Sequence, residues 1–349
     1  MKAFGFAAFG ADQDLAPFSF ERRDLLADDV AIDILYCGIC HSDLHQARND
    51  WKGSTYPMVP GHEIVGLVRA VGPAVKELKV GDPVAVGCMV DSCMTCDQCT
   101  DGEQQFCRCG ATFTYNSADK KHGGFTYGGY SNSIVVRDKF VLRVPSKLDL
   151  KRVGPILWSG VTCYVPLREW NVGPGTRVAI AGLGGLGHMG VKLAVGLGAN
   201  VTVITTSPDK AKDAKNLGAH DVLLSTDTAA MKAHAMKFDF ILDTIPVAHD
   251  FAPYIQLLDT DGSIVVVGAL DMTPSFHSGL LVRGRRRLTG SVIGGIERTQ
   301  EVLAFCADKN ILPDCEILPV DQVNKAYERL LKNDVKYRFV LDMAGLPKT

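Results

Sequence analysis

The chain has 349 residues, 46% of them hydrophobic, and a formal net charge of −2. This length allows two domains, because single cores stop growing at roughly 250–300 residues. The near-neutral charge argues against a nucleic-acid partner or an anionic membrane surface. No stretch reaches the roughly 18 consecutive apolar residues of a membrane span, and the N-terminus lacks the pattern of a secretory or transit peptide. We therefore expect a cytoplasmic protein, whose 11 cysteines serve metal binding or packing rather than disulfides.

The pattern of apolar runs changes along the chain. Residues 28–145 hold short runs such as HEIVGLVRAVG and VGDPVAVG, separated by Gly, Pro and Asp, which predicts a β-rich, barrel-like domain. After about residue 165, β-branched runs such as TRVAIAG, NVTVITT and FDFILDT alternate with helical patterns. That alternation predicts parallel strands buried on both faces, a doubly wound α/β domain. The last sixty residues return to a mixed pattern, with a helix near RTQEVLAFCADKN and a closing strand in YRFVLDM.

Two segments, GICHSDLH and PGHEIVG, bring together residue types that suit a catalytic metal site. Cys40 and His62 are typical zinc ligands, and Glu63 adds a carboxylate beside them. Asp43 is expected to accept the other imidazole N–H of His62 and so fix its tautomer. Each residue alone has an ordinary structural explanation, but together they favour a functional site.

The same segment offers a route for a proton. The hydroxyl of Ser42 is suited to bond an alcohol oxygen, and His45 is suited to pass the proton on to water. We therefore predict Ser42, His45 and Asp43 as catalytic side chains.

Four cysteines follow in the pattern Cys93-x2-Cys96-x2-Cys99-x7-Cys107. Four thiolates at this spacing can close a tetrahedral Zn²⁺ shell with no open position, so we predict a structural zinc that holds a loop. Cys109 is an alternative to Cys107. An iron–sulfur cluster is the alternative occupant.

The stretch VAIAGLGGLGHMG contains G-x-G-x-x-G after a predicted strand and at the start of a predicted helix. The first glycine allows the tight turn, the second lets the backbone approach a pyrophosphate, and the third lets helix and strand pack closely. The helix N-terminus supplies N–H groups for the phosphates. The predicted pyrophosphate-binding residues are Gly182, Leu183, Gly184, Gly185, Leu186 and Gly187.

The end of the next predicted strand indicates which dinucleotide binds. An NAD enzyme needs an acid there to accept bonds from the ribose 2′-OH. This chain instead has Thr205, Thr206 and Ser207, followed by Lys210. Hydroxyl and ammonium groups suit a 2′-phosphate, so we predict NADP(H). Asp209 is interpreted as an acid in the first turn of a helix.

Together these motifs resemble the zinc-dependent medium-chain alcohol dehydrogenases, and within them the cinnamyl-alcohol-dehydrogenase group with its bacterial NADP-dependent aldehyde reductases. The likeness rests on GICHSDLH, YPMVPGHEIVG, GGYSNSIVV, GLGGLGHMGVKLA and GSVIGGIERTQEVLAFCA, and it runs from about residue 30 to the C-terminus. It implies an α/β fold: a GroES-like β-rich catalytic domain over residues 1–151 and 290–349, and a Rossmann NADP-binding domain over residues 152–289. It also implies a homodimer.

The resemblance assigns roles residue by residue. Cys40 and His62 match ligands of the catalytic zinc, and Glu63 matches an adjacent acid that can enter or leave the shell. Ser42 and His45 match a proton relay. The further cofactor contacts that it implies are His41 at the pyrophosphate, Thr162, Thr244, Gly268, Ser291, Val292 and Ile293.

The chain departs from the family at one metal ligand. The family reads Leu-Cys-Ala-Gly where this chain has Leu157-Trp158-Ser159-Gly160, so the third cysteine ligand is lost. Trp158 cannot replace it, because the indole N–H only donates. Cys163 would be turned about 140° away on a helix. Three outcomes stay open: Glu63 supplies the ligand, the metal is absent or weakly held, or another cysteine takes the place.

These observations predict an NADP(H)-dependent oxidoreductase that interconverts aromatic or medium-chain primary alcohols and aldehydes by hydride transfer, at a zinc site without its usual third cysteine. The alternatives are a zinc-depleted ene-reductase acting on an activated C=C bond and a catalytically silent NADP-binding protein. The aromatic residues predicted to form the substrate pocket wall are Trp51, Phe113, Tyr115 and Trp158.

Overall fold

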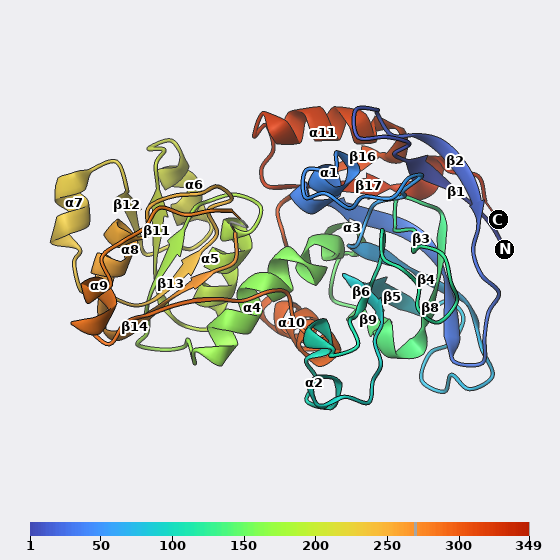
Figure 1. Cartoon of the computed structure of the whole chain (residues 1–349), viewed down its shortest axis with the longest axis horizontal. Helices are drawn as coiled ribbons and strands as arrows, with labels where there is room; N and C mark the ends of the chain where they lie inside the picture. Colours follow the sequence, from blue (N-terminus) through green and yellow to red (C-terminus); the bar gives the residue numbers. More distant parts are fainter. Residues whose placement is uncertain (269–270, 349) are drawn as a thin grey trace. The chain divides into compact units, whose positions relative to one another are not determined.

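The computed structural model describes residues 1–268 and 271–348 of the chain. These residues form two compact units (Figure 1), one of Met1–Trp158 with Gly294–Thr349 and one of Ser159–Ile293. The unit boundaries fall a few residues after the expected domain limits at 151 and 289. The first shift arises because the 3₁₀ helix η3 (Gly154–Leu157) contacts strands β3, β5 and β17 of the first unit. Trp158 therefore belongs to the β-rich unit.

The first unit is built on a mixed sheet with the strand order β16-β17-β3-β4-β5-β9, and β8 also pairs with β3. Only β16 and β17 run parallel; the other pairs are antiparallel. Its strands are β3 (Asp29–Ile39), β4 (Ile64–Val71), β5 (Pro83–Val86), β8 (Ser133–Arg137), β9 (Leu142–Arg143), β16 (Cys315–Pro319) and β17 (Arg338–Asp342). Two smaller antiparallel pairs are β1 (Lys2–Ala7) with β2 (Ala16–Glu21), and β6 (Met89–Asp91) with β7 (Thr112–Phe113).

Short helices connect these strands, and two longer ones follow the return of the chain to this unit. The longer helices, α10 and α11, bury residues at the i, i+3, i+4, i+7 spacing of an amphipathic helix. The described helices of this unit are α1 (His41–Ala47), α2 (Asp97–Thr100), α3 (Leu150–Val153), α10 (Ile296–Lys309) and α11 (Val323–Leu331), with the 3₁₀ helices η1 (Gln104–Phe106), η2 (Asp138–Phe140), η3, η4 (Val320–Gln322) and η5 (Met343–Gly345).

The pairing of β3 with β4 places the first candidate site. The two strands are antiparallel, with Cys37 opposite Ile64. The end of β3 therefore lies beside the start of β4, which brings Cys40 close to His62 and Glu63 although they are distant in sequence. Helix α1 starts directly after Cys40, whose backbone has extended dihedral angles.

The second unit is a parallel sheet with the strand order β12-β11-β10-β13-β14-β15. This order is that of the doubly wound dinucleotide-binding fold, and it reverses between β10 and β13. The strands are β10 (Arg177–Ala181), β11 (Asn200–Thr205), β12 (Asp221–Leu224), β13 (Phe238–Asp243), β14 (Leu258–Val266) and β15 (Arg287–Gly290). The described helices are α4 (Ser159–Glu169), α5 (Gly187–Gly196), α6 (Lys210–Asn216), α7 (Thr228–Ala233), α8 (Ala252–Leu257) and α9 (Gly279–Val282).

The central strands of this sheet, β10, β11 and β13, are buried along nearly their whole length rather than on alternate residues. In β10 the residues after Arg177 are all buried, and β13 buries Phe238 and Phe240–Asp243. Strands of this kind need helices on both faces, and contacts join α5 to β10 and β11, α8 to β14, and α4 to β13. The predicted α/β fold class, a β-rich unit plus a doubly wound unit, is confirmed.

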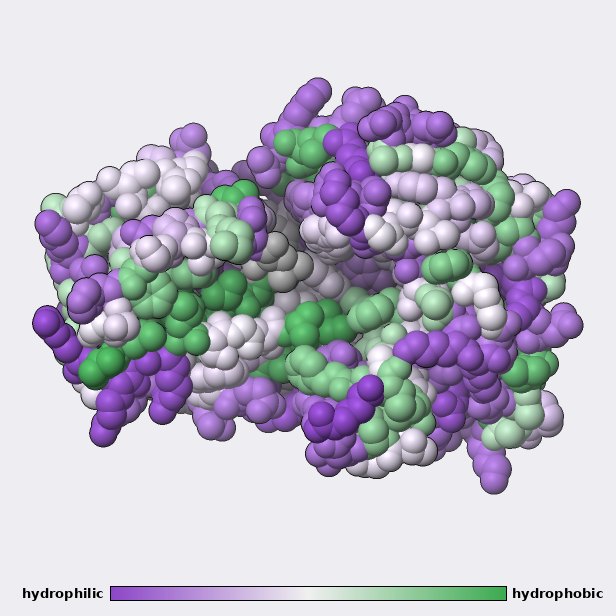
Figure 2. Space-filling model, in the orientation of Figure 1, coloured by the Kyte–Doolittle hydropathy of each residue, from purple (hydrophilic) through white to green (hydrophobic). Residues whose placement is uncertain are grey.

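The surface mixes polar and apolar side chains. On the face shown in Figure 2, hydrophilic side chains are spread over both units and hydrophobic patches interrupt them. Among the described residues, no helix has both the length and the apolar character needed to cross a membrane.

Candidate active site and metal centres

Three buried side chains from the β3–α1 and β4 junctions point donor atoms at one another. The sulfur of Cys40, a ring nitrogen of His62 and a carboxylate oxygen of Glu63 all lie within 4.8 Å of one another. Nε2 of His62 and Oε2 of Glu63 are buried and have no hydrogen-bond partner among the described residues. Buried polar atoms are rarely left without a partner, so these two atoms indicate a missing ligand.

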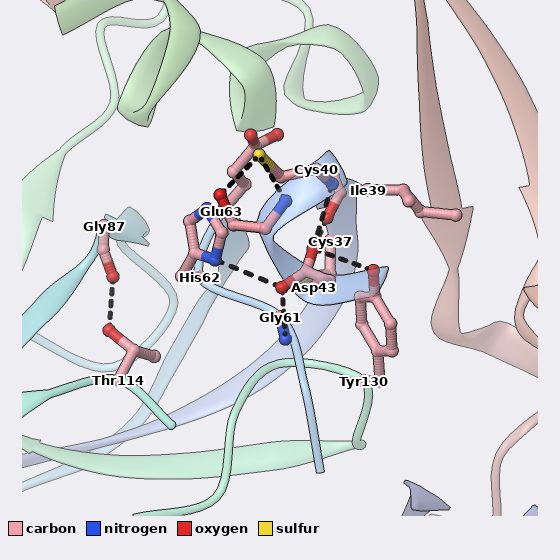
Figure 3. A network of polar contacts seen from close by, with 12 residues as sticks. Cys37, Ile39, Cys40, Asp43, Gly61, His62, Glu63, Gly87, Thr114 and Tyr130 are labelled. Carbon is pink, nitrogen blue, oxygen red and sulfur yellow. Dashed lines mark hydrogen bonds and ion pairs between the residues drawn. The ribbon is translucent and has the colours of Figure 1, made fainter. Parts of the chain in front are cut away.

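The carboxylate of Asp43 contacts both the ring of His62 and the backbone of Cys40 (Figure 3). Its Oδ1 accepts from Gly61 N at 3.1 Å and lies 3.1 Å from His62 Nδ1, while Oδ2 accepts from Cys40 N and from Tyr130 Oη, both at 2.9 Å. Burial by itself would raise the pKa of Asp43, but the charge of His62 and these hydrogen bonds lower it below its usual value. The carboxylate thus stays ionised and orients the ring so that Nε2 faces the donor group.

Glu63 is fixed by a buried ion pair. Its Oε1 accepts from the guanidinium of Arg338, which also donates to Ile39 O at 2.9 Å. Burial would lower the pKa of Arg338, but the carboxylate of Glu63 raises it above its ordinary value. A side chain at Gly38 would overlap Oε2 of Glu63, so this position needs glycine. The pair holds one oxygen of Glu63 and leaves the other directed at His62 and Cys40.

Two aromatic rings contact His62. Tyr115 stacks on the imidazole with centroids 5.8 Å apart, and Trp158 meets it edge-on at 6.0 Å. Trp158 is therefore adjacent to the donor group, and it is not one of the three donors. Of the other predicted aromatic residues, Phe113 is exposed, and Trp51 lies 5.3 Å from His45 and not at His62.

Among the described residues, Cys163, the cysteine weighed above as a substitute, is not a member of the donor group, and neither are Cys37 and Cys88. Cys163 is buried in α4, where its sulfur donates to Leu186 O at 3.4 Å. Cys37 is buried, and its sulfur bonds Gly38 O at 3.6 Å. Cys88 lies near enough to His62 and Cys40 to interact with their charges, and burial raises its pKa to about 12.

The predicted relay residues lie on α1. The hydroxyl oxygen of Ser42 accepts a hydrogen bond from Cys40 Sγ at 3.3 Å, so Ser42 borders the donor group. His45 stands one turn further on the same helix, partly exposed, with Nδ1 2.8 Å from Asp50. Ser42 therefore lies beside the donor group, and His45 lies nearer to solvent.

The four predicted thiols of the second group are brought together. Cys93, Cys96, Cys99 and Cys107 place their sulfurs within 4.8 Å of one another, while Cys109 is exposed and outside the group. The backbone N–H groups of Thr95 and Cys96 lower the pKa of Cys93 to about 5, which favours the thiolate that a metal needs.

This cysteine loop contacts the start of α10. Ile296 N donates to Gln104 Oε1 at 3.0 Å, and a side chain at Gly295 would overlap Gly102 O. A metal held by the four thiols would therefore fix the loop against this helix.

The glycine loop of the second unit has the geometry that a dinucleotide requires. Gly182 has a φ of +91°, a conformation that side chains rarely adopt. A side chain at Gly187 would overlap Gly182 O, whereas one at Gly184 would point into open space. Leu183, Gly185 and Leu186 lie between these glycines, ahead of the N-terminus of α5. The open space at Gly184 is consistent with the close approach of a ligand to the backbone that the motif predicts.

The hydroxyl cluster after β11 lies beside this loop. Gly182 N donates to Ile204 O at 2.9 Å, and Lys210 Nζ donates to Leu183 O at 3.0 Å. Thr205 is buried at the strand end, Thr206 is exposed, and Ser207 N bonds Thr205 Oγ1 at 3.3 Å.

The cofactor residues implied by resemblance fall into three places. Thr244 Oγ1 donates to Ala181 O at 2.8 Å, and Gly268 lies against the Thr244 backbone, so both adjoin the glycine loop. Thr162 is buried in α4, with Oγ1 lacking a hydrogen-bond partner among the described residues. Ser291, the exposed Val292 and the buried Ile293 follow β15, and His41 is exposed at the start of α1.

The sequence reasoning missed three residues of the donor site: Tyr130, Arg338 and Gly38. All three lie inside motifs named above: Tyr130 in GGYSNSIVV, Arg338 in the closing strand YRFVLDM and Gly38 at the start of GICHSDLH. A charged Arg338 among apolar strand residues was a signal of a buried ionic partner. The motif did not show why Gly38 is needed, because its constraint comes from a side chain distant in sequence.

The donor sets fit the metals that the motifs imply. Four thiols with no open position match a structural zinc. Cys40, His62 and Glu63 offer sulfur, nitrogen and oxygen, and their two partnerless buried atoms are what a bound cation would satisfy.

Comparison with known proteins agrees with this geometry. Residues 26–146 match the alcohol dehydrogenase GroES-like domain, and residues 185–308 match the zinc-binding dehydrogenase domain. Aldehyde reductase YahK of Escherichia coli (strain K12) is 48% identical over 345 residues, covering 98% of both chains. The chain belongs to the zinc-dependent medium-chain alcohol dehydrogenases.

Solved structures place it in the cinnamyl alcohol dehydrogenase group of this family. A cinnamyl alcohol dehydrogenase from Sorghum bicolor is 42% identical over the whole of both chains, with a TM-score of 0.95. The Helicobacter pylori enzyme, solved in complex with NADP(H), is 39% identical over 99% of both chains, with a TM-score of 0.91. The chain is accordingly an enzyme, an oxidoreductase of the alcohol dehydrogenase type.

Proposed function

We propose that this alcohol dehydrogenase interconverts aldehydes and primary alcohols, aromatic or medium-chain, by hydride transfer with NADP(H), at a metal site of Cys40, His62 and Glu63. The observation that supports this proposal most is that these three buried side chains bring their donor atoms close together. In addition, His62 Nε2 and Glu63 Oε2 have no hydrogen-bond partner among the described residues. The relatives named for aldehyde reduction and for an NADP(H) complex support the reaction and the cofactor. The hydroxyl and ammonium groups of Thr205–Lys210 would receive the 2′-phosphate.

Zinc bound here would polarise a substrate oxygen and lower the pKa of an alcohol. The chain's own residues would do the rest. Asp43 keeps His62 oriented, and Arg338 keeps one oxygen of Glu63 turned toward the donors. Ser42, next to Cys40, would exchange the hydroxyl proton with the substrate oxygen, and His45 would pass it to solvent. The indole of Trp158 would narrow the space beside His62.

We also propose a structural zinc at the four thiols, which fixes their loop against α10, and a homodimer as the assembled form. The homodimer is inferred from membership of the family.

The first test is a metal count on three proteins. We expect about two zinc ions per chain for the wild type, and about one for each of Cys96→Ser and His62→Ala, because each variant removes a ligand from one site. A wild-type count of one that falls to zero in Cys96→Ser and does not change in His62→Ala would contradict the catalytic metal site.

The second test separates the two chemistries. Steady-state oxidation of NADPH with cinnamaldehyde should yield cinnamyl alcohol. A saturated aldehyde as product would instead support the ene-reductase, the alternative that the tryptophan in the third ligand position favours. No turnover on any aldehyde would point to the silent NADP-binding protein.

A further inference from the structure

His249 is a histidine of the second unit whose two ring nitrogens both face oxygens. It lies between β13 and α8, with Nδ1 2.9 Å from Val247 O and Nε2 2.9 Å from Asp243 Oδ2. The second contact is an ion pair when the ring is protonated. The Asp243 side chain is fully buried, and that of His249 is 14% exposed.

The chemistry of these contacts selects one protonation state. A carbonyl oxygen and an ionised carboxylate only accept, whereas a neutral imidazole carries a single N–H. Only the imidazolium can donate to Val247 O and at the same time place a positive charge beside the buried carboxylate of Asp243. Loss of its charge leaves either Val247 O or the buried carboxylate of Asp243 without its contact.

The groups facing the ring favour the charged form. Asp243 on β13 raises the pKa of His249 above its ordinary value, burial opposes this, and Val247 O and the neighbouring Asp250 act in the same direction as Asp243. The ring of Tyr254 in α8 packs edge-on at 5.5 Å, and that of Phe251, the residue just before α8, does so at 4.8 Å.

The segment 244–248, which lies between Asp243 and His249, contacts the glycine loop directly. Asp243 Oδ1 accepts from Ile245 N at 3.1 Å, so the same carboxylate holds both ends of the segment. Between them, Thr244 Oγ1 bonds Ala181 O and, at 3.3 Å, Gly182 O. A Cβ at Gly268 would lie 2.5 Å from Ile245 O. Three predicted cofactor residues thus meet at this segment.

We propose that His249 is a positioning residue for the cofactor: its imidazolium, held by Asp243 and Val247, keeps Thr244 and Ile245 against the glycine loop, so that NADP(H) binds more tightly to the protonated form. The proposal rests on the cofactor part of the proposed function and not on the substrate or the metal.

The sign of the pH dependence follows. The folded pKa of His249 is raised above its ordinary value, 6.5, so the full effect is present below that value. It is lost as the pH rises through the folded pKa. Affinity for the cofactor therefore falls on going to alkaline pH.

The test is the dissociation constant of the cofactor as a function of pH, measured by fluorescence for the wild type and His249→Gln. Glutamine can bond one neighbour but carries no charge. We expect His249→Gln to bind about fivefold more weakly than the wild type at low pH, and the two to converge at high pH. His277→Gln, at an exposed histidine of the same unit, should match the wild type throughout. NADH is measured beside NADPH, because it lacks the titrating 2′-phosphate.

Each outcome decides between readings. A defect of His249→Gln that is equal at every pH would mean a merely structural ring and would overturn the proposal. If the protein bound NADH but not NADPH, the proposed cofactor would be wrong. The effect of His249 on cofactor affinity would then be measured with NADH. Should the variant fail to fold, the His249 pKa is measured by NMR in the wild type: it must be higher in the complex than in the free protein, and an unchanged pKa would refute the coupling.

Discussion

Trp158 stands where the resemblance to the family leads us to expect the third cysteine ligand. It lies edge-on to His62, in the β-rich unit that carries the donors. Glu63, beside His62, has one oxygen bound to Arg338, and its other oxygen has no hydrogen-bond partner among the described residues. A carboxylate in place of a thiolate would make the proposed site harder and weaken its affinity for zinc.

Restoring the thiol tests this directly. Trp158→Cys should raise the affinity for zinc and the rate of aldehyde reduction together, so that it keeps about two zinc ions per chain at a chelator concentration that depletes the wild type. Trp158→Phe is the matched control, because it reduces the bulk without adding a ligand. It should leave the zinc content unchanged. Equal zinc affinity of Trp158→Cys and Trp158→Phe, determined by competition with a chelator, would show that this position does not reach the metal.

At the scale of elements, two glycines in the turn between β10 and α5, Gly184 and Gly187, have different roles. Gly187 is required by the fold, because its Cβ would overlap Gly182 O, whereas Gly184 faces open space. The same turn therefore holds one glycine needed for packing and one that leaves room for a ligand.

Alanine variants at these two glycines should therefore affect different properties, cofactor affinity in one case and stability in the other. Gly184→Ala should leave the free energy of unfolding nearly unchanged but weaken NADPH binding about tenfold, because a methyl group enters the pyrophosphate space. Gly187→Ala should lower the free energy of unfolding by about 1–3 kcal/mol. Thermal denaturation and cofactor titration measure the two effects. If Gly184→Ala bound NADPH as tightly as the wild type, the phosphate would lie elsewhere.

At the scale of the whole molecule, the candidate metal sites and the glycine loop lie in different units. Both groups of candidate metal ligands among the described residues belong to the β-rich unit, and the glycine loop belongs to the doubly wound unit. Metal and cofactor should therefore stabilise different parts of the chain.

Hydrogen exchange followed by mass spectrometry can localise both effects. A strong chelator should accelerate exchange around residues 88–113 and 38–64 and leave β10 and β11 unchanged, whereas NADPH should protect the turn after β10. Cys96→Ser should reproduce only the change around residues 93–107, lower the free energy of unfolding by about 3 kcal/mol and leave NADPH affinity unchanged. Loss of NADPH binding in Cys96→Ser would show that the four-thiol loop is not purely structural.

The motifs predicted much of the site because their spacing is local. The four thiols lie within one loop, and the glycines of the dinucleotide turn lie within one strand–helix junction. The pairing of Cys40 with His62 was expected from residue type and resemblance, and it depends on the antiparallel register of β3 and β4. The two compact units divide a few residues after the predicted domain limit at 151, because residues 154–157 pack on the β-rich unit, which no local pattern reveals.

By itself, the sequence determined the fold class, the four-thiol loop and the glycine turn, since these follow from apolar periodicity and from ligands a few residues apart. Only the tertiary structure decided what surrounds the donors. Arg338 reaches Glu63 from the last strand, Tyr130 reaches Asp43 from a distant loop, and Gly38 leaves space for a carboxylate. Such contacts depend on which strands become neighbours, and strand pairing over long sequence separations is set by the burial of the whole sheet rather than by any local pattern.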